Sequence, residues 1–436
     1  MARKVVAAGS GNVLEWYDFT AYGFLAPIIG TAFFPSDDPV ASLLAAFGAL
    51  AAGYAARPFG SIIFGHIGDR IGRKPALLIS VVIMGFGALG IGLLPTYAQI
   101  GIAGPILLVV LRCVQGISVA GEYANSGVLL TESSQPRQRG LIGSWIVFGM
   151  TCGCLLGSGV SALASNMLGQ EVMQEWGWRL PFLFGSVIAI FSVILRIHLT
   201  ESPVMVARAK AETSPIITAI RTQWRPMLII IGFVLPTGIG YFLIFVYAAS
   251  YLTDQMHFTT AQALDISTVS MVAFAAVAPI SGYLSDRIGR KPVMYVTLIG
   301  TLVLAWPLWA LMHEQTLALI FLGQIVLAAL NGIGWAMTIP MMVELLPAKV
   351  RVSAVAISYN ICLAVFGGTT PWVATYLVQR TSFDYAPVIY WMAAAVIALV
   401  IVLRLPEMAR KPLPYAWDAA SRERRTPRQE SRRRTG

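Results

Sequence analysis

Apolar runs of about 20 residues recur along the whole chain, and their length constrains its fold more than any other feature. A run of this length spans the hydrocarbon core of a bilayer, whereas surface helices of soluble proteins carry apolar stripes with a 3.6-residue period. The stretch Leu77–Leu94 is apolar on every face. Because 57% of the residues are hydrophobic and only 12% are charged, a water-soluble fold could not bury them all. The sequence therefore predicts an all-α membrane protein.

The apolar runs predict twelve transmembrane helices. We expect the first run to be retained rather than cleaved as a signal peptide, because Glu15 and Asp18 interrupt it and no signal-like cleavage site follows. The expected spans are 13–33, 40–67, 76–94, 102–130, 141–168, 179–197, 226–252, 264–284, 293–312, 316–345, 352–379 and 384–404.

The basic residues are distributed unevenly between the loops. Nearly all of the 31 Lys and Arg fall in alternate loops and in the tail, whereas the opposite loops hold only Arg179 and Arg380. Cytoplasmic loops of membrane proteins carry such an excess. We therefore expect both termini to be cytoplasmic, which requires an even number of spans. The net charge of +10 then reflects membrane topology and not nucleic-acid binding.

A loop motif recurs half a chain length later. Residues 65–75, G-H-I-G-D-R-I-G-R-K-P, reappear at 282–292 as G-Y-L-S-D-R-I-G-R-K-P. A second echo follows the fourth span of each half and consists of Glu132-x3-Pro136-x2-Arg139 and Glu344-x2-Pro347-x3-Arg351. The sequence therefore predicts two pseudo-symmetric six-helix bundles, with substrate held between them near the midplane and reached by alternating access.

The duplication also divides the chain. We expect an N-terminal bundle at 1–197, a cytoplasmic linker at 198–225, a C-terminal bundle at 226–404 and a basic cytoplasmic tail at 405–436.

The repeated loops are predicted to act at the cytoplasmic gate. Glycines permit the tight turn, and the basic residues keep that turn in the cytoplasm. Asp69 and Asp286 are expected to accept hydrogen bonds from neighbouring helix N-termini or from Arg, as a latch that closes the inner gate in one state. The predicted gating residues are Gly65, Asp69, Arg70, Gly72, Arg73, Asp286, Arg287, Gly289 and Arg290.

These motifs resemble a known family. The repeated G-x3-D-R-x-G-R-K loop and Arg112-Cys-Val-Gln115-Gly116 resemble signatures of the major facilitator superfamily. Further segments resemble its metabolite:proton symporters, which include proline/betaine, citrate, 2-oxoglutarate and shikimate carriers. These segments are Gly11-Asn12-x-x-Glu15-Trp16-Tyr17-Asp18-Phe19, Arg57-Pro58, Gly121-Glu122-Tyr123, Trp176-Gly-Trp-Arg-x-Pro-Phe182 and Glu201-Ser-Pro203. The resemblance implies the major facilitator fold, a plasma (bacterial inner) membrane location and a functional monomer.

Two departures from the superfamily's patterns are informative. Its drug antiporters carry a proline kink in span five, but the run from Gly149 through Gly153 to Gly157 has no proline, and glycines four apart indicate close helix packing. This favours symport or uniport over antiport. The segment Pro412–Gly436 also lacks the heptads of osmosensing carriers, so osmotic activation is not predicted.

Ionisable residues within the spans are the candidates for proton coupling, because charge is costly in a membrane and marks function by default. The clear cases all lie in the first half: Glu15, Asp18, Arg57, Arg112 and Glu122. At a rise of about 1.5 Å per residue, Asp18 and Glu122 lie about 8 and about 12 Å from the cytoplasmic ends of their spans, and Arg57 reaches the same level. We therefore expect Arg57 to face more than one acid and to act as a proton switch, with Asp18 as the favoured proton carrier and Glu122 the second choice.

Arg112 lies nearer the middle of its span. Its guanidinium suits either a substrate carboxylate or the expulsion of a proton from an acid. A static salt bridge remains an alternative for these buried charges. Polar and aromatic residues predicted to line the cavity with Arg112 are Asn12, Trp16, Tyr17, Tyr22, Tyr123, Asn125, Trp145, Tyr241, Tyr247, Asn331, Trp335, Tyr359, Asn360 and Trp372.

The charge balance bears on the substrate. Three buried acids against two buried arginines leave little positive charge for a di- or tricarboxylate, so a zwitterion such as proline or betaine is favoured, and citrate- or 2-oxoglutarate-like acids are the alternative. A proton-independent facilitator, a membrane-bound enzyme and a solute sensor were also considered. The sequence shows no phosphate-binding loop, catalytic cluster or metal-ligand spacing, so it predicts no enzyme activity, no cofactor beyond the proton and no metal.

Overall fold

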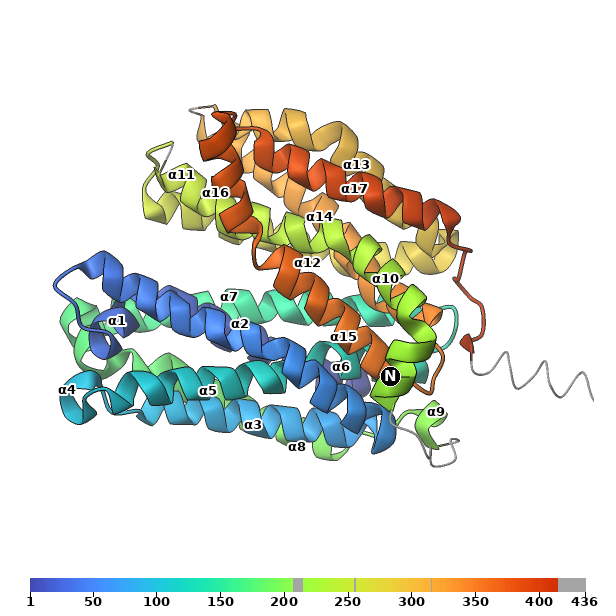
Figure 1. Cartoon of the computed structure of the whole chain (residues 1–436), viewed down its shortest axis with the longest axis horizontal. Helices are drawn as coiled ribbons and strands as arrows, with labels where there is room; N and C mark the ends of the chain where they lie inside the picture. Colours follow the sequence, from blue (N-terminus) through green and yellow to red (C-terminus); the bar gives the residue numbers. More distant parts are fainter. Residues whose placement is uncertain (207–214, 255, 315, 415–436) are drawn as a thin grey trace, which may run out of the picture.

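The computed structural model describes residues 1–206, 215–254, 256–314 and 316–414, and this part of the chain is helical without strands. Two groups of helices lie one above the other in Figure 1, the first half of the chain below and the second half above. The two groups are the two halves of the predicted duplication.

The first half contains six spans, the fourth of which is interrupted at Ala120 and Gly121. They are α1 (Ala2–Phe33), α2 (Pro39–Arg70), α3 (Arg73–Leu93), α5 (Ala103–Val119) with α6 (Glu122–Ser133), α7 (Arg139–Val172) with η1 (Met173–Gly177), and α8 (Arg179–Ile197). The short helices α4 (Tyr97–Ile100) and α9 (Pro203–Val206) lie outside the spans.

The second half repeats this order, and its first and fifth spans contain a π-helical turn. The spans are α10 (Pro215–Phe242) with η2 (Leu243–Tyr247) and α11 (Ala248–Asp254), α12 (Thr260–Ile288), α13 (Arg290–Leu311), α14 (Leu317–Leu345), α15 (Arg351–Cys362) with η3 (Leu363–Gly367) and α16 (Thr370–Thr381), and α17 (Ala386–Arg404).

Eleven helices of the described residues are long and apolar enough to cross a membrane. The twelfth span is α1, which has 32 residues but carries buried Glu15 and Asp18 in its interior. Its charges lower its apolar character, yet its length of about 48 Å exceeds the thickness of a hydrocarbon core. The chain is therefore a multi-pass membrane protein with the predicted twelve spans.

Two helix starts differ from the expected ranges. Helix α1 begins at Ala2 instead of residue 13, and α10 begins at Pro215 inside the expected linker. Both segments contain polar residues that a search for apolar runs leaves out. Most of the predicted basic tail lies outside the described residues.

Glycines bring the helices around the buried charges into close contact. In α2, Gly53 faces the backbone of Arg112, and Gly60 faces the backbone of Ile117. In α7, Gly153 and Gly157 face the backbone of α1. The close packing predicted for the glycine run of span five is therefore present, and α1, α2, α5 and α7 meet without intervening side chains.

The two halves contact each other mainly through two helix pairs, α2 with α15 and α7 with α12. Each pair joins one helix from each half, which is the arrangement expected from a two-fold pseudo-symmetric duplication. A continuous cluster of buried hydrophobic residues crosses this interface and contains side chains from both halves, including Trp16, Tyr123, Trp335 and Tyr359. The interface is therefore a packed layer at the level of these residues.

Replacing Gly60 by Ala tests the contact between α2 and α5. A Cβ there overlaps the backbone of Ile117, which cannot move as a flexible side chain does, so we expect the variant to lose about 1–3 kcal/mol of stability. Gly48→Ala in the same helix is the matched control, because nothing lies within 4 Å of its added Cβ. Melting temperatures of the purified variants decide the matter, and equal values for Gly60→Ala and the wild type would contradict the contact.

Candidate functional site

Asp18 and Arg112 form an ion pair enclosed within the first half. Arg112 Nη1 donates to Asp18 Oδ2 at 2.5 Å and to Gln115 Oε1 at 2.9 Å, and both charged side chains are 0% exposed. The Arg112 guanidinium lies 3.7 Å from the ring centre of Tyr22, with Phe182 on the same side chain at 5.7 Å. Every one of these neighbours belongs to the first half. Arg112 is therefore engaged by an acid and by aromatic rings from its own bundle.

Glu15 and Arg57 form a second buried pair. Arg57 Nη1 lies 3.4 Å from Glu15 Oε1, and both residues are 3% exposed. The guanidinium lies over the rings of Phe19 at 4.8 Å and Tyr54 at 4.4 Å. Cation–π contacts of this kind supplement the ion pair in a dry environment.

Glu122 has its own cation, Arg196 at the end of α8. Arg196 Nη1 donates to Glu122 Oε2 at 3.0 Å, Nη2 binds Oε1, and Ser80 donates to Oε2 at 2.7 Å. Arg196 also binds the carbonyls of Ala7 and Ala8 in α1. This bidentate pair ties α1, α3, α6 and α8 together.

The prediction that Arg57 faces both Asp18 and Glu122 is wrong. Each of the three carboxylates has an arginine of its own within the described residues, because the three acids point to different sides of their helices. The sequence missed Arg196, which lies one residue from the end of α8 and was assigned to the cytoplasmic loop. The excess of three buried acids over two buried arginines was the signal that could have found it.

A small cavity separates two of these pairs. It measures about 10 Å³ and is lined by Glu15 and Glu122 together with Ser80 and Ser118. Such a volume is comparable to the room that one water molecule needs, and its lining offers polar partners.

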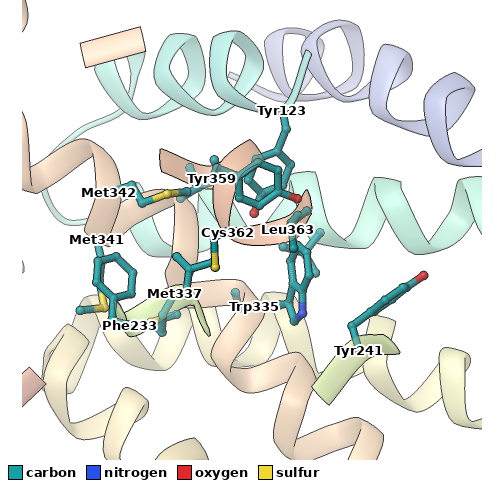
Figure 2. Packing of buried hydrophobic residues seen from close by; sticks show 14 of the residues in the cluster. Tyr123, Phe233, Tyr241, Trp335, Met337, Met341, Met342, Tyr359, Cys362 and Leu363 are labelled. Carbon is teal, nitrogen blue, oxygen red and sulfur yellow. The ribbon is translucent and has the colours of Figure 1, made fainter. Parts of the chain in front are cut away.

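Aromatic residues from both halves meet at the interface. Tyr123 of the first half stacks on Tyr359 at 4.2 Å between ring centres, and its hydroxyl lies 2.6 Å from that of Thr338. Figure 2 shows Tyr123 reaching toward Tyr359 and Trp335, with Tyr241 nearby. Trp16 contacts Tyr241 across the interface at 5.6 Å.

Several predicted cavity residues lie at this interface, and others do not. At the interface are Trp16, Tyr123, Tyr241, Trp335, Tyr359 and Asn360, whose amide donates to the Ala120 carbonyl. Within a single half are Asn12, Tyr17, Tyr22, Asn125, Tyr247 and Asn331, which bond or pack against neighbours of their own bundle. Trp145 and Trp372 are exposed. For Tyr17 and Tyr22 the reason is geometric, since their hydroxyls donate to the carbonyls of Pro181 and Ala46.

The repeated loops make the predicted bonds to helix N-termini. Asp69 accepts from the N–H groups of Val352 and Ser353 at 3.2 and 2.8 Å, at the start of α15. Asp286 accepts from Gly140 and Leu141 at 2.9 and 2.8 Å, at the start of α7. Each aspartate therefore caps a helix of the opposite half, and its charge complements the helix dipole.

The second repeated motif also crosses the interface. Arg351 Nη1 lies 2.6 Å from Glu132 Oε1, and the equivalent Arg139 Nη1 lies 3.9 Å from Glu344 Oε1. The glutamate of each copy thus faces the arginine of the other. Arg73 and Arg290 bind the same two glutamates from within their own halves.

The remaining loop residues support the turns. Gly72 and Gly289 have φ values of 144° and 112°, which only glycine adopts readily. Gly65 packs against Ser353 of the other half. Arg70 and Arg287 are exposed to solvent, so the structure gives them no interhelical partner role comparable to Arg73 and Arg290.

Acidic residues beyond the two bundles' last spans cap the helices that follow these turns. Glu201 accepts from the N–H groups of Arg73 and Lys74, and Glu407 accepts from those of Arg290 and Lys291. Burial raises the pKa of Glu407, but its backbone hydrogen bonds outweigh that effect and hold the pKa below its usual range.

Within the described residues, no group of three or more His, Cys, Asp or Glu side chains is arranged to hold a metal ion. The site thus consists of paired charges and aromatic rings.

Known families and structures match both halves of the chain. Residues 4–215 match the family model of the sugar (and other) transporters, and residues 237–433 match that of the Major Facilitator Superfamily. The xylose:proton symporter XylE, bound to 6-bromo-6-deoxy-D-glucose, matches with a TM-score of 0.78 and 18% identity over 96% of this chain and 98% of the other. At this identity the likeness concerns the fold alone.

Curated relatives are closer in sequence. The glycine betaine/proline/ectoine/pipecolic acid transporter OusA of Dickeya dadantii is 37% identical over 97% of this chain and 86% of its own length. The proline/betaine transporter of Escherichia coli K12 is 36% identical with the same coverage, and the ectoine/proline transporter ProP of Corynebacterium glutamicum is 33% identical over 92% and 83%. The relatives are transporters, not enzymes, and the chain belongs to the major facilitator superfamily, among its proton-coupled metabolite transporters.

Proposed function

We propose that the protein takes up a zwitterionic solute of the proline and betaine class by symport with protons. The observation that carries this proposal is the one-to-one pairing of three buried acids with three buried arginines in the first half. The paired charges sum to zero, which suits a substrate without net charge better than a di- or tricarboxylate. The names of the relatives, which are proline, betaine and ectoine transporters, favour the same class.

Asp18 is the proposed proton carrier. Its partner Arg112 stabilises the ionised form, so a proton reaches Asp18 only when a conformational change loosens the pair. When the pair closes again, Arg112 expels the proton. Arg112 therefore takes the second of its two predicted roles, since its guanidinium is held by an acid of its own bundle. Glu122, bound on both oxygens by Arg196, is better suited to a structural role.

The loops between the second and third spans of each half form the proposed inner gate. Asp69 and Asp286 hold the start of a helix from the opposite half, and these bonds must break before the cytoplasmic side opens. We place this gate and both termini on the cytoplasmic side of a bacterial inner membrane, in agreement with the distribution of Lys and Arg. The protein acts as a monomer, with the proton as its only coupling ion and no cofactor.

Uptake into proteoliposomes tests the proposed function. With an imposed inward proton gradient, labelled L-proline or glycine betaine should accumulate above its outside concentration, and a protonophore should abolish this accumulation. Uphill accumulation that survives the protonophore would contradict symport. Uptake that only equilibrates would identify a facilitator, and accumulation of citrate in place of the zwitterions would assign the alternative substrate class.

Replacing Asp18 by Asn tests the proton carrier. The amide cannot exchange a proton, so we expect uphill uptake to fall to the background while exchange of substrate across the membrane in counterflow persists. Asp38→Asn provides the control, because Asp38 only caps α2 outside the buried pairs and Asn is an equally good cap. Accumulation by Asp18→Asn equal to that of the wild type would show that another group carries the proton.

Replacing Asp69 by Asn tests the gate. Two N–H groups converge on the carboxylate, and an amide offers only one acceptor oxygen and no charge, so the inward-open state should gain population. Spin labels at Arg70 and Lys349, in a background without the four native cysteines, report the opening as a longer distance in electron–electron resonance. A distance distribution unchanged from that of the gate-intact protein would refute the latch.

A further inference from the structure

We propose that the Glu15–Arg57 pair, and not Arg112, binds the substrate: the carboxylate of the zwitterion docks on Arg57 and its cationic nitrogen on Glu15. The inference rests on the proposed function, because it names the site for the same substrate class. It also changes the role that the sequence suggests for both residues, from proton coupling to substrate binding.

Arg57 has an edge ready for a carboxylate. Its Nη1 faces Glu15, whereas its Nε and Nη2 are buried and have no hydrogen-bond partner. These two N–H groups form one side of the guanidinium and bind the two oxygens of a carboxylate in parallel. The rings of Phe19 and Tyr54 lie against the guanidinium and hold its plane in place. Buried donors without a partner are costly, so this edge is better satisfied when a ligand is bound.

Glu15 offers the complementary charge. Its Oε1 faces Arg57, and its Oε2 is buried without a partner. The two free groups therefore belong to opposite charges that lie next to each other. A zwitterion with its carboxylate and its nitrogen on adjacent carbon atoms carries the same two charges in the opposite order. A dicarboxylate, in contrast, would place its second negative charge beside Glu15.

The pair lies close to the second half of the protein. Tyr359 on α15 interacts electrostatically with both Glu15 and Arg57, and Tyr123, which stacks on Tyr359, interacts with Glu15. Aromatic faces at this position suit the cationic nitrogen of proline or of a betaine. The cavity between Glu15 and Glu122 has only about 10 Å³, so a solute reaches Glu15 from the interface and not from there.

Arg112 also has unpartnered Nε and Nη2 groups, so the free edge alone does not decide between the two arginines. The difference lies in their surroundings. The ring and ion-pair partners of Arg112 all come from the first half, whereas Glu15 and Arg57 adjoin Tyr359 of the second half. A substrate that is carried by alternating access must be contacted by both halves, and only the Glu15–Arg57 pair meets this condition.

Binding of three related solutes to the purified full-length protein tests the inference. The solutes are L-proline, L-prolinamide, which lacks the carboxylate, and cyclopentanecarboxylate, which lacks the amine. Affinities are measured by calorimetry at one pH and without a gradient, for the wild type, Arg57→Lys, Glu15→Gln and Arg112→Lys. The quantity of interest is the ratio of affinities between proline and each analogue, because a general loss of stability does not change this ratio selectively.

We expect the wild type to prefer proline to both analogues at least tenfold. Arg57→Lys keeps the charge but loses the fork, so it should reduce the preference over prolinamide at least tenfold. Glu15→Gln should reduce the preference over cyclopentanecarboxylate to a similar extent. If one of these two variants does not fold, as judged from its melting temperature, the other still tests its end of the substrate.

The inference is overturned if both variants keep the wild-type ratios, or if Arg112→Lys alone removes the discrimination against prolinamide. These outcomes differ from a failure of the proposed function. Wild-type protein that binds zwitterions without proton-driven accumulation would end the symport proposal and leave the binding site intact. Wild-type protein that binds no zwitterion at all would overturn the substrate class and this site together.

Discussion

Charge neutralisation inside the first bundle is the constraint on which the rest of the structure depends. Hydrocarbon offers no partner to a carboxylate, so each acid within the spans needs a cation from a neighbouring helix. Glu15 and Asp18 on α1 reach α2 and α5, and Glu122 on α6 reaches α8. Breaking such a buried pair costs about 3–5 kcal/mol, so these contacts restrict how the helices can rotate against each other. The glycine contacts between the same helices allow that close approach.

The two halves use a different kind of electrostatic contact. Their inner ends are joined by aspartates that cap helices of the opposite half and by Glu–Arg pairs that cross between the halves. The duplication is not symmetric in strength, since the Glu132–Arg351 distance is 2.6 Å and the Glu344–Arg139 distance is 3.9 Å. These contacts involve polar groups at the ends of helices, which water can solvate when the halves separate. They are therefore suited to breaking and re-forming, unlike the pairs inside the bundle.

The sequence predicts the features that depend on local patterns. Twelve spans, the duplication and the helix-capping aspartates follow from apolar run length and from repeated motifs, and the structure contains them. The pairing of the buried charges does not follow, because depth along a helix can be estimated from rise per residue but the direction of a side chain around it cannot. Asp18 and Glu122 lie at similar depth, yet they face different helices. Arg196 shows the second limit, since a residue at the end of an apolar run can belong either to the loop or to the buried core.

Phe19 provides a physical connection between the two pairs that the proposals separate. Its ring lies 4.8 Å from the guanidinium carbon of Arg57 and 5.8 Å from that of Arg112. A change in either ion pair that moves its arginine therefore alters the packing of a ring against the other. Proton binding at Asp18 and solute binding at Glu15 and Arg57 act on one helix, α1, within a single turn of each other. Coupling between them requires only a small displacement of that helix, and not a signal carried across the interface between the halves.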